Sequence, residues 1–455
     1  MHPSWPDSNQ EQLRRWERDH LWYPFTQMAT LVDDPPPLIV GAEGMYLVDA
    51  DGRRYLDGVS SLWVNVHGHR VAAIDAAITD QLQHVAHSTL LGLTHPPAIM
   101  LAKALVDVAP AGLSRVFYSD TGACAVEIAL KMAYQYGTLT GTAERHHFFR
   151  LNRGYHGDTI GAVSVGGIEL FHGTYRPLLF PTIPVESPYC YRCPWGQRYP
   201  GCNRACFDHV AEVVAQGASR ACGFIMEPLV QGAGGMITLP PGYTAFVRQV
   251  TKRHGVPLIL DEVATGFGRT GTLFAAEREN VQPDLMVLSK GLSGGYLPIA
   301  ATMVCEEIFE AFLGGPERTF FHGHTYTGNP LAARAALANL QLMQTSGLLQ
   351  QLPARIAVLT AALEALAALP HVGEVRQCGM MVGVELVADA ASTSPYPGEL
   401  RMGARACQAA RRRGVFIRPL GDVVVMMPPL AMSHDQLRSF VAVVGEAIAE
   451  VTESA

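Results

Sequence analysis

Two charged residues that each follow a short apolar run carry the clearest chemistry in this sequence. Lys290 comes after residues 285–288 and before a glycine-rich segment, and Asp261 ends the apolar run 257–260. A buried ammonium is costly unless its pKa falls or it finds a partner, and a lysine with a lowered pKa is an amine nucleophile that forms Schiff bases. An acid on a neighbouring strand can hold a pyridinium nitrogen. The pair therefore suggests a site for pyridoxal phosphate (PLP).

A turn of small residues could hold the phosphate of such a cofactor. Residues 116–118 form an apolar run, residues 119–122 a small polar turn, and a helix-compatible segment follows from Ala123. A helix N-terminus with a glycine offers unpaired N–H groups and the positive end of the helix dipole. Thr121, Gly122 and Ala123 would supply hydroxyl and backbone donors. A plain connection between strand and helix is the alternative, and in isolation it is the commoner one.

Two further polar turns contain candidate ligand groups. Tyr155, between glycines in residues 154–159, could stack on a planar cofactor, or it could be buried in a tight polar turn. Thr325, in the polar segment 322–330, is a hydroxyl donor for a phosphate. The histidines at 322 and 324 make a poor metal signal, because no acids lie near them.

Two arginines are candidates for binding carboxylates. Arg269 lies in the glycine-rich stretch 265–271, where it could fix an acid or a substrate carboxylate. Arg418 is a single charge after an apolar run and could bind a carboxylate through its planar fork. A surface ion pair is the alternative for Arg418.

The elements that must position these groups are short strands alternating with helices. Continuous apolar runs separated by helical segments are typical of a parallel sheet that is covered on both faces. Such sheets bind ligands at the carboxyl ends of their strands, where Asp261 and Lys290 fall. The expected strands are 116–118, 148–149, 224–226, 258–260, 285–288 and 300–304, with helices at 123–136 and 243–254 among them.

The flanking parts of the chain have a different pattern. Residues 1–45 are expected to form an irregular arm, and residues 44–56 a hairpin. Apolar residues recur at helical spacing over 71–109. A long helix is expected after residue 330, followed by a mixed unit with strands at 381–386 and 423–426 and a closing helix.

Bulk composition excludes several classes of function. The chain has 455 residues, 48% of them hydrophobic, and a net charge of -7, so it has a large core and no basic footprint for nucleic acid. No apolar run approaches the roughly 20 residues that span a bilayer. The first seven residues lack the basic-then-apolar order of a signal peptide. We therefore expect neither nucleic acid nor membrane as a partner, and a cytoplasmic location.

Four of the nine cysteines cluster in sequence. Their spacing, Cys190-x2-Cys193-x8-Cys202-x3-Cys206, could hold zinc as four thiolates, or it could be a loop of reduced thiols. A zinc-binding scaffold without catalysis is the corresponding non-enzyme alternative. We assign no metal ligands from the sequence.

Residues 261–271, 289–291 and 294–298, taken together, closely resemble the class III, fold-type I PLP aminotransferases over nearly the whole chain. Within that family, residues 21–28, 67–69, 155–161 and 417–421 are similar to the branch that aminates 8-amino-7-oxononanoate in biotin biosynthesis. The resemblance implies an α/β fold: a large domain (76–335) with a mostly parallel seven-stranded sheet, and a smaller α+β domain from both termini (1–75 and 336–455).

The resemblance also implies roles for single residues. Lys290 would be the catalytic lysine, Asp261 would hold the pyridinium, and Tyr155 would stack on the ring. The remaining cofactor contacts would be Gly122, Ala123, His324 and Thr325, with Thr325 reaching the neighbouring subunit of a homodimer that shares its active sites. The substrate contacts would be Phe25, Leu62, Trp63, Tyr155, Gly323 and Arg418.

Two positions depart from the pattern of family members that use S-adenosylmethionine as amino donor. A tyrosine is expected where Phe25 stands, and a tryptophan where Leu62 stands. The cysteine-rich insertion resembles a branch that includes enzymes with lysine as donor. S-adenosylmethionine is the expected donor, with lysine, or a broad omega-amino acid or diamine:pyruvate aminotransferase, as alternatives.

Overall fold

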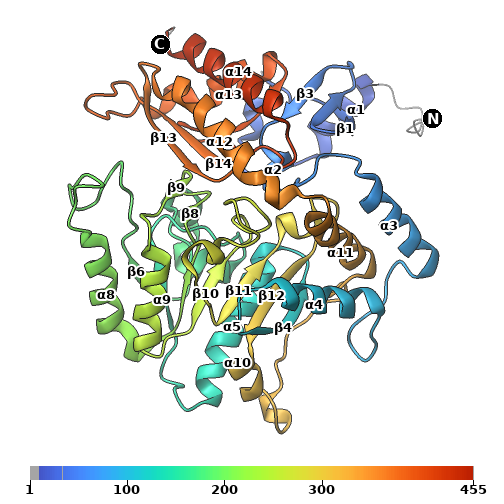
Figure 1. Ribbon diagram of the computed structural model, residues 1–455, viewed down its shortest axis with the longest axis vertical. Coiled ribbons are helices and arrows are strands. Elements are labelled where there is room, and N and C mark those ends of the chain that lie inside the picture. The colour runs from blue at the N-terminus through green and yellow to red at the C-terminus, as the bar shows by residue number, and fades with distance from the viewer. Residues whose placement is uncertain (1–9, 33, 454–455) are drawn as a thin grey trace.

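A seven-stranded sheet forms the centre of the larger part of the molecule (Figure 1). In the computed structural model, which describes residues 10–32 and 34–453, the strand order is β4-β12-β11-β10-β7-β5-β6. All neighbouring pairs are parallel except the two that involve β12, so the mostly parallel sheet expected from the sequence is confirmed. The strands are β4 (Leu113–Ser119), β5 (His147–Leu151), β6 (Ile183–Val185), β7 (Ala221–Met226), β10 (Leu258–Asp261), β11 (Leu285–Leu288) and β12 (Ala300–Cys305).

Helices cover both faces of this sheet. Helix α5 (Gly122–Leu139) packs on one face, where it meets Ile259 of β10. Helices α8 (Ala205–Gly217) and α9 (Tyr243–Arg253) pack on the other, against the two leucines of the same strand. Successive side chains of a strand point to opposite faces, so β7, β10 and β11 are buried along their whole length.

Both ends of the chain build the smaller part. Strands β1 (Ile39–Glu43), β2 (Tyr46–Asp49) and β3 (Arg54–Asp57) are joined by β15 (Val415–Phe416), which pairs parallel with β3. A second sheet has the order β13-β14-β17-β16, from β13 (Val372–Cys378), β14 (Met381–Leu386), β17 (Val423–Met426) and β16 (Arg418–Leu420). Helices α12 (Leu348–Ala367), α13 (Met402–Arg412) and α14 (His434–Thr452) complete this part. The domain boundaries at residues 75 and 335 stay a prediction.

The structure corrects one expectation about the first quarter of the chain. The arm expected to be irregular contains helix α1 (Gln10–His20). The helical spacing over 71–109 is confirmed by two helices, α3 (Ala72–His84) and α4 (Pro96–Val108). Prolines 96 and 97 lack N–H donors and suit the first turn of α4. The hairpin is confirmed as β2 and β3, and the helix after residue 330 as α11 (Pro330–Thr345). The first seven residues, on which the leader argument depends, lie outside the described part.

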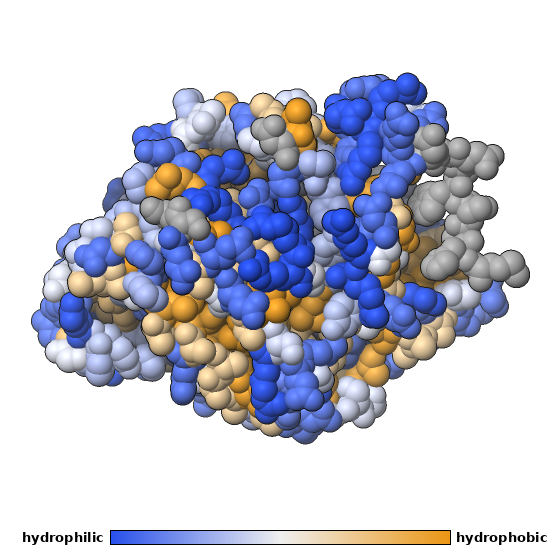
Figure 2. All heavy atoms as spheres, turned by 90° about the horizontal axis from the view of Figure 1, so that it is seen from above, coloured by the Kyte–Doolittle hydropathy of each residue, from blue (hydrophilic) through white to orange (hydrophobic). Residues whose placement is uncertain are grey.

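On the face seen from above, hydrophilic residues cover much of the surface, with hydrophobic patches between them (Figure 2). In residues 10–32 and 34–453, no helix is both long and apolar enough to cross a membrane.

Candidate active site

The carboxyl ends of β4, β10 and β11 meet at one edge of the sheet and line a cavity of about 690 Å³. Asp261 is the last residue of β10, and Lys290 lies two residues beyond the end of β11. Thr121, two residues beyond β4, is the N-cap of α5. Because these three strands are parallel, the sheet brings together groups that are far apart in the sequence.

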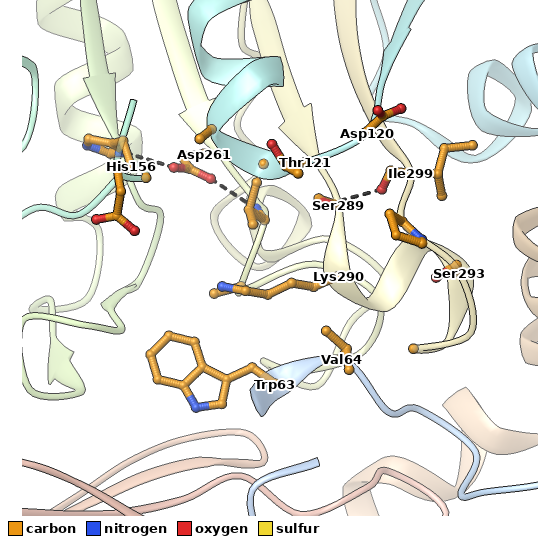
Figure 3. Close-up of a pocket in the computed structure, with 18 of the residues that line it drawn as sticks. Trp63, Val64, Asp120, Thr121, His156, Asp261, Ser289, Lys290, Ser293 and Ile299 are labelled. Carbon is orange, nitrogen blue, oxygen red and sulfur yellow. Dashed lines mark hydrogen bonds and ion pairs between the residues drawn. The ribbon is translucent and has the colours of Figure 1, made fainter. Parts of the chain in front are cut away.

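The Lys290 side chain crosses this cavity between Asp261 on one side and the Trp63 indole on the other (Figure 3). Its Nζ lies 4.7 Å from the centroid of the Trp63 ring. Lys290 has a φ of 46°, in the left-handed region, which costs a non-glycine residue free energy and is found more often at functional sites. Burial lowers the pKa of Lys290 below its ordinary 10.5, while the carboxylates of Asp261 and Glu227 oppose that shift. The neutral, nucleophilic amine is thereby favoured.

Hydrogen bonds fix the Asp261 carboxylate on both oxygens. Its Oδ2 lies 2.7 Å from Nδ1 of His156, and its Oδ1 accepts a hydrogen bond from the Val263 N–H at 3.0 Å (Figure 3). Asp261 and His156 are both buried. A carboxylate held this rigidly can pair with a cationic ring nitrogen without first reorganising.

The N-terminus of α5 opens into the same cavity. Helix α5 has 18 residues, and Thr121 Oγ1 accepts a hydrogen bond from the Cys124 N–H at 3.3 Å. A Cβ on Gly122 would lie 2.8 Å from Cγ1 of Val263, so the close approach of these two segments requires glycine. Free N–H groups and the helix dipole suit a phosphate there. The amine, the acid and this anion site fit the three parts of PLP.

A buried acid that the sequence reasoning missed completes the wall of this cavity. Glu227 Oε1 accepts a hydrogen bond from the Tyr155 N–H at 3.1 Å, and Oε2 accepts one from the Gly232 N–H at 2.8 Å. Burial raises the pKa of Glu227 to about 7. Glu227 follows the apolar run of β7 directly, as Asp261 ends that of β10, so the same rule would have found it.

A second cavity, of about 770 Å³, lies against the first. Trp63, Tyr155 and Lys290 line both cavities. The Tyr155 hydroxyl donates a hydrogen bond to Asp158 at 2.7 Å, which fixes its ring. Phe25, Leu62 and Arg418 line the second cavity alone, so the structure brings together all the predicted substrate residues except Gly323.

A strained turn places Trp63 and Leu62 in this wall. Ser60, Ser61, Leu62 and Trp63, the residues of α2 (Ser60–Trp63), all have φ between 47° and 73°. Left-handed backbone costs an L-residue roughly 1–2 kcal/mol, so neighbouring contacts must hold the turn. Ser60 Oγ donates to the Met427 carbonyl at 2.7 Å, and Ser61 Oγ donates to the Asp57 carboxylate at 2.7 Å. No sequence pattern indicated this turn.

Three predicted residues line neither cavity of this subunit: Gly323, His324 and Thr325. His324 Nε2 lies 3.6 Å from Oδ1 of Asp120, and Asp120 lines the first cavity.

Arg269 lines neither cavity, so the suggestion that it binds a substrate carboxylate is wrong. Arg269 is 1% exposed, and its guanidinium donates hydrogen bonds to the carbonyls of Pro428 and Asn65, at 2.7 and 2.6 Å. Arg269 therefore joins the large part of the molecule to segments of the small part. The glycines around it had indicated only a loop.

The four clustered cysteines surround a small separate hollow and are all free thiols. Desolvation raises the pKa of Cys190 to about 11, with further contributions from the other three cysteines. Across the described residues, no group of three or more His, Cys, Asp or Glu is arranged to hold a metal ion.

Comparison with known families gives one family for nearly the whole chain. The family model for aminotransferase class III matches residues 28–448. An adenosylmethionine-8-amino-7-oxononanoate aminotransferase of Geobacter sulfurreducens is 49% identical over 450 residues, which cover 98% of this chain and 99% of that protein.

Solved structures show the same similarity in three dimensions. The crystal structure of adenosylmethionine-8-amino-7-oxononanoate aminotransferase from Methanocaldococcus jannaschii superposes with a TM-score of 0.93 at 41% identity, covering 97% of this chain and 99% of that one. An amine transaminase from an uncultivated Pseudomonas species, in a PLP-bound form, superposes with a TM-score of 0.90 at 37% identity, covering 95% and 98%.

Proposed function

The chain belongs to the class III aminotransferase family, and we propose that it transfers an amino group from S-adenosylmethionine to 8-amino-7-oxononanoate in biotin biosynthesis. It is an enzyme of the aminotransferase class, and its cofactor is pyridoxal 5'-phosphate. The observation that carries the proposal is that Lys290 lines both cavities. One amine can then serve a cofactor in the first cavity and a substrate in the second. The relatives that carry this activity in their names match nearly the full length.

We assign the cofactor contacts to the first cavity. Asp261, supported by His156, would accept a hydrogen bond from the ring nitrogen and keep it cationic, and Thr121, Gly122 and Ala123 would hold the phosphate. Tyr155 would lie on the ring. When bound, PLP supplies an electron sink for the carbon from which the amino group departs.

Lys290 performs the proton transfers in this proposal. Its neutral Nζ takes a proton from the substrate carbon that carries the amino group, and the same nitrogen later gives a proton back. The lowered pKa matches this work, because an ammonium cannot accept a proton. The two substrates use the site one after the other, a ping-pong sequence.

Arg418 would hold the carboxylate of the oxononanoate. It is exposed on β16 of the small domain, and no hydrogen bond or ion pair to its guanidinium is found within residues 10–32 and 34–453. A planar fork without a protein partner is available for a carboxylate. Phe25, Leu62 and Trp63 would form the apolar wall along the carbon chain of the substrate.

A homodimer in the cytoplasm is part of the proposal. Class III aminotransferases act on small molecules and are typically dimeric. Residues 323–325 line neither cavity of their own subunit, and their chain neighbours Phe321 and Tyr326 are exposed. Gly323, His324 and Thr325 would therefore complete the active site of the partner subunit, with Thr325 at its phosphate. Sedimentation of the purified protein and cell fractionation test these two statements.

The deciding experiment supplies 8-amino-7-oxononanoate with S-adenosylmethionine or with lysine and measures 7,8-diaminononanoate. Product from S-adenosylmethionine supports the proposal. Product from lysine and not from S-adenosylmethionine would identify lysine as the amino donor instead. The similarity to an amine transaminase favours a second candidate, an omega-amino acid or diamine:pyruvate aminotransferase. Amine transfer to pyruvate without turnover of the oxononanoate would select that candidate.

A further inference from the structure

The substrate cavity has a second cation with no assigned role. Arg153 follows β5 and lines the same cavity as Arg418, from the large domain rather than the small one. Arg153 is exposed, and among the residues that the structure describes its guanidinium has neither a hydrogen bond nor an ion pair. Cations among the lining residues of the two cavities are limited to Lys290, Arg153 and Arg418, apart from His156.

The backbone of Arg153 is held in an unfavourable conformation. Its φ is 63°, in the left-handed region that arginine rarely adopts. The Arg153 N–H donates to the Gly167 carbonyl at 3.0 Å, and a Cβ on Gly234 would lie 2.5 Å from the Arg153 carbonyl oxygen. Gly167 and Gly234 also line the cavity. The contacts of these glycines with the Arg153 backbone fix the direction in which the Arg153 side chain projects from the cavity wall.

The cysteine-rich segment, residues 188–206, supports the Arg153 side chain. The Arg153 guanidinium lies 5.5 Å from the centroid of the Tyr189 ring, a cation–π distance. Tyr189 is buried, and its hydroxyl donates to Glu385 and accepts from Arg376 Nη1 at 3.0 Å. The ring is therefore fixed by the small domain.

The two substrates of the proposed reaction place their carboxylates differently. In 8-amino-7-oxononanoate the carboxyl carbon and the reacting ketone carbon are six bonds apart, about 7 Å in an extended chain. In an α-amino acid donor the carboxylate is bonded directly to the carbon that carries the amine. With the reacting carbons at one place beside Lys290, the two carboxylates cannot meet the same cation unless that cation moves by several ångströms.

We propose that Arg153 is a specificity-determining residue that binds the α-carboxylate of the amino donor, while Arg418 binds that of the oxononanoate, and that Tyr189 is its positioning residue. This inference rests on the proposed function. The cysteine-rich segment then has a role without a metal: it supplies the ring on which the donor-binding arginine lies.

The test compares Arg153→Ala with Arg418→Ala in the full enzyme, with KM measured separately for S-adenosylmethionine and for the oxononanoate. Loss of a charge-assisted hydrogen bond predicts that Arg153→Ala raises the donor KM on the order of 10- to 100-fold and leaves the oxononanoate KM within about twofold. Arg418→Ala raises the oxononanoate KM and leaves the donor KM within about twofold. Arg198→Ala, an exposed arginine of the cysteine-rich segment that lines neither cavity, is the matched control and keeps both KM values.

Two further measurements separate binding from folding. Decarboxylated S-adenosylmethionine, which lacks the carboxylate, binds the wild type and Arg153→Ala equally well. Tyr189→Leu raises the donor KM in the same direction, and Arg153→Lys restores part of the affinity as a point charge without the fork. Melting temperature and absorbance of the bound cofactor establish that each variant is folded and loaded.

An unchanged donor KM in Arg153→Ala overturns the inference, and so does an Arg418→Ala variant that loses affinity for both carboxylates. In either case the proposed function stands, provided that the wild type makes diaminononanoate. If the wild type aminates the oxononanoate from neither S-adenosylmethionine nor lysine, the proposed function fails and the inference fails with it.

Discussion

The two cavities that meet at Lys290 are built in opposite ways. In the first, the two acids at the ends of β7 and β10 are buried: Asp261 is 3% exposed and Glu227 is 4% exposed, and each carboxylate accepts two hydrogen bonds. In the second, Phe25 is 64% exposed and Leu62 is 53% exposed. The two arginines of the second cavity, Arg153 and Arg418, have no ion pair in the described part of the chain.

This difference follows from the cost of burying charge. A charge taken out of water must be paired, so a buried catalytic group comes with a network that fixes its position. An exposed arginine keeps its solvation until a substrate carboxylate displaces the water. We therefore expect substitutions in the first cavity to lower kcat and cofactor affinity, and those in the second to change KM for one substrate.

The largest effect is expected for Lys290→Ala. Because this change removes both the amine that holds the cofactor and the group that moves the proton, kcat falls by at least about 100- to 10,000-fold. Borohydride reduction followed by peptide mass analysis finds the cofactor on the Lys290 peptide of the wild type. Lys103→Ala, at an exposed lysine of α4, keeps the labelled peptide. Labelling of the variant at another lysine would contradict the assignment.

Asp261→Asn preserves the shape of the acid and removes its charge. Loss of one partner of a buried charge pair costs about 3–5 kcal/mol, which corresponds to a fall in kcat of roughly 100- to 5,000-fold. His156→Gln keeps the carboxylate and loses its support, so steady-state kinetics should show a smaller fall, about tenfold. Equal losses in the two variants would remove the distinction between the acid and its support.

Glu227 makes the free energy of unfolding of the protein depend on pH. Its pKa is about 7 in the folded protein, against an ordinary value of 4.5, so the folded state holds the proton more tightly than the unfolded chain. The contribution of Glu227 to the free energy of unfolding is therefore fully present below pH 4.5. It is lost as the pH rises towards 7, and the total loss is roughly 3 kcal/mol.

Glu227→Gln removes the titrating carboxyl group, so the free energy of unfolding of this variant varies less with pH over that range. Urea unfolding between about pH 5 and pH 8 measures the slopes, and Glu11→Gln, on the exposed face of α1, keeps the wild-type slope. A wild-type slope in Glu227→Gln would show that another group titrates.

Gly122→Ala tests the phosphate end of the first cavity. The added Cβ meets Cγ1 of Val263 at 2.8 Å and forces the N-terminus of α5 away from β10. Overpacking of this kind costs about 1–3 kcal/mol, so PLP titration of the apoenzyme should give an affinity about tenfold lower. Gly398→Ala is the control, since a Cβ there has no neighbour within 4 Å.

The smallest effect is expected for Phe25→Tyr in the second cavity. One added hydroxyl on a largely exposed ring contributes about 1 kcal/mol, so the KM for S-adenosylmethionine falls several-fold while kcat stays unchanged. Initial rates at saturating oxononanoate measure both constants. A large change in kcat instead would mean that Phe25 takes part in the catalytic machinery.

The first cavity was more accessible to sequence reasoning than the second. Asp261 ends a strand of four buried residues and Lys290 lies just beyond another, and the rule that ligands bind at the carboxyl ends of parallel strands places them together. Glu227 obeys the same rule and was missed, although it follows six buried residues of β7. Arg269 shows the limit of the approach, because the sequence gives its charge but not the two backbone carbonyls that take it up.

The sequence by itself determined the strand–helix alternation, the family, and the lysine and acid at the ends of their strands, because apolar periodicity and strand ends are local properties. Only the tertiary structure decided what faces them. Trp63 reaches Lys290 through a left-handed turn held by Met427 and Asp57, and the unpaired Arg153 lies on Tyr189, 36 positions further along the chain. Most of these contacts join segments remote in sequence, and the strained turn persists only once the surrounding core has formed.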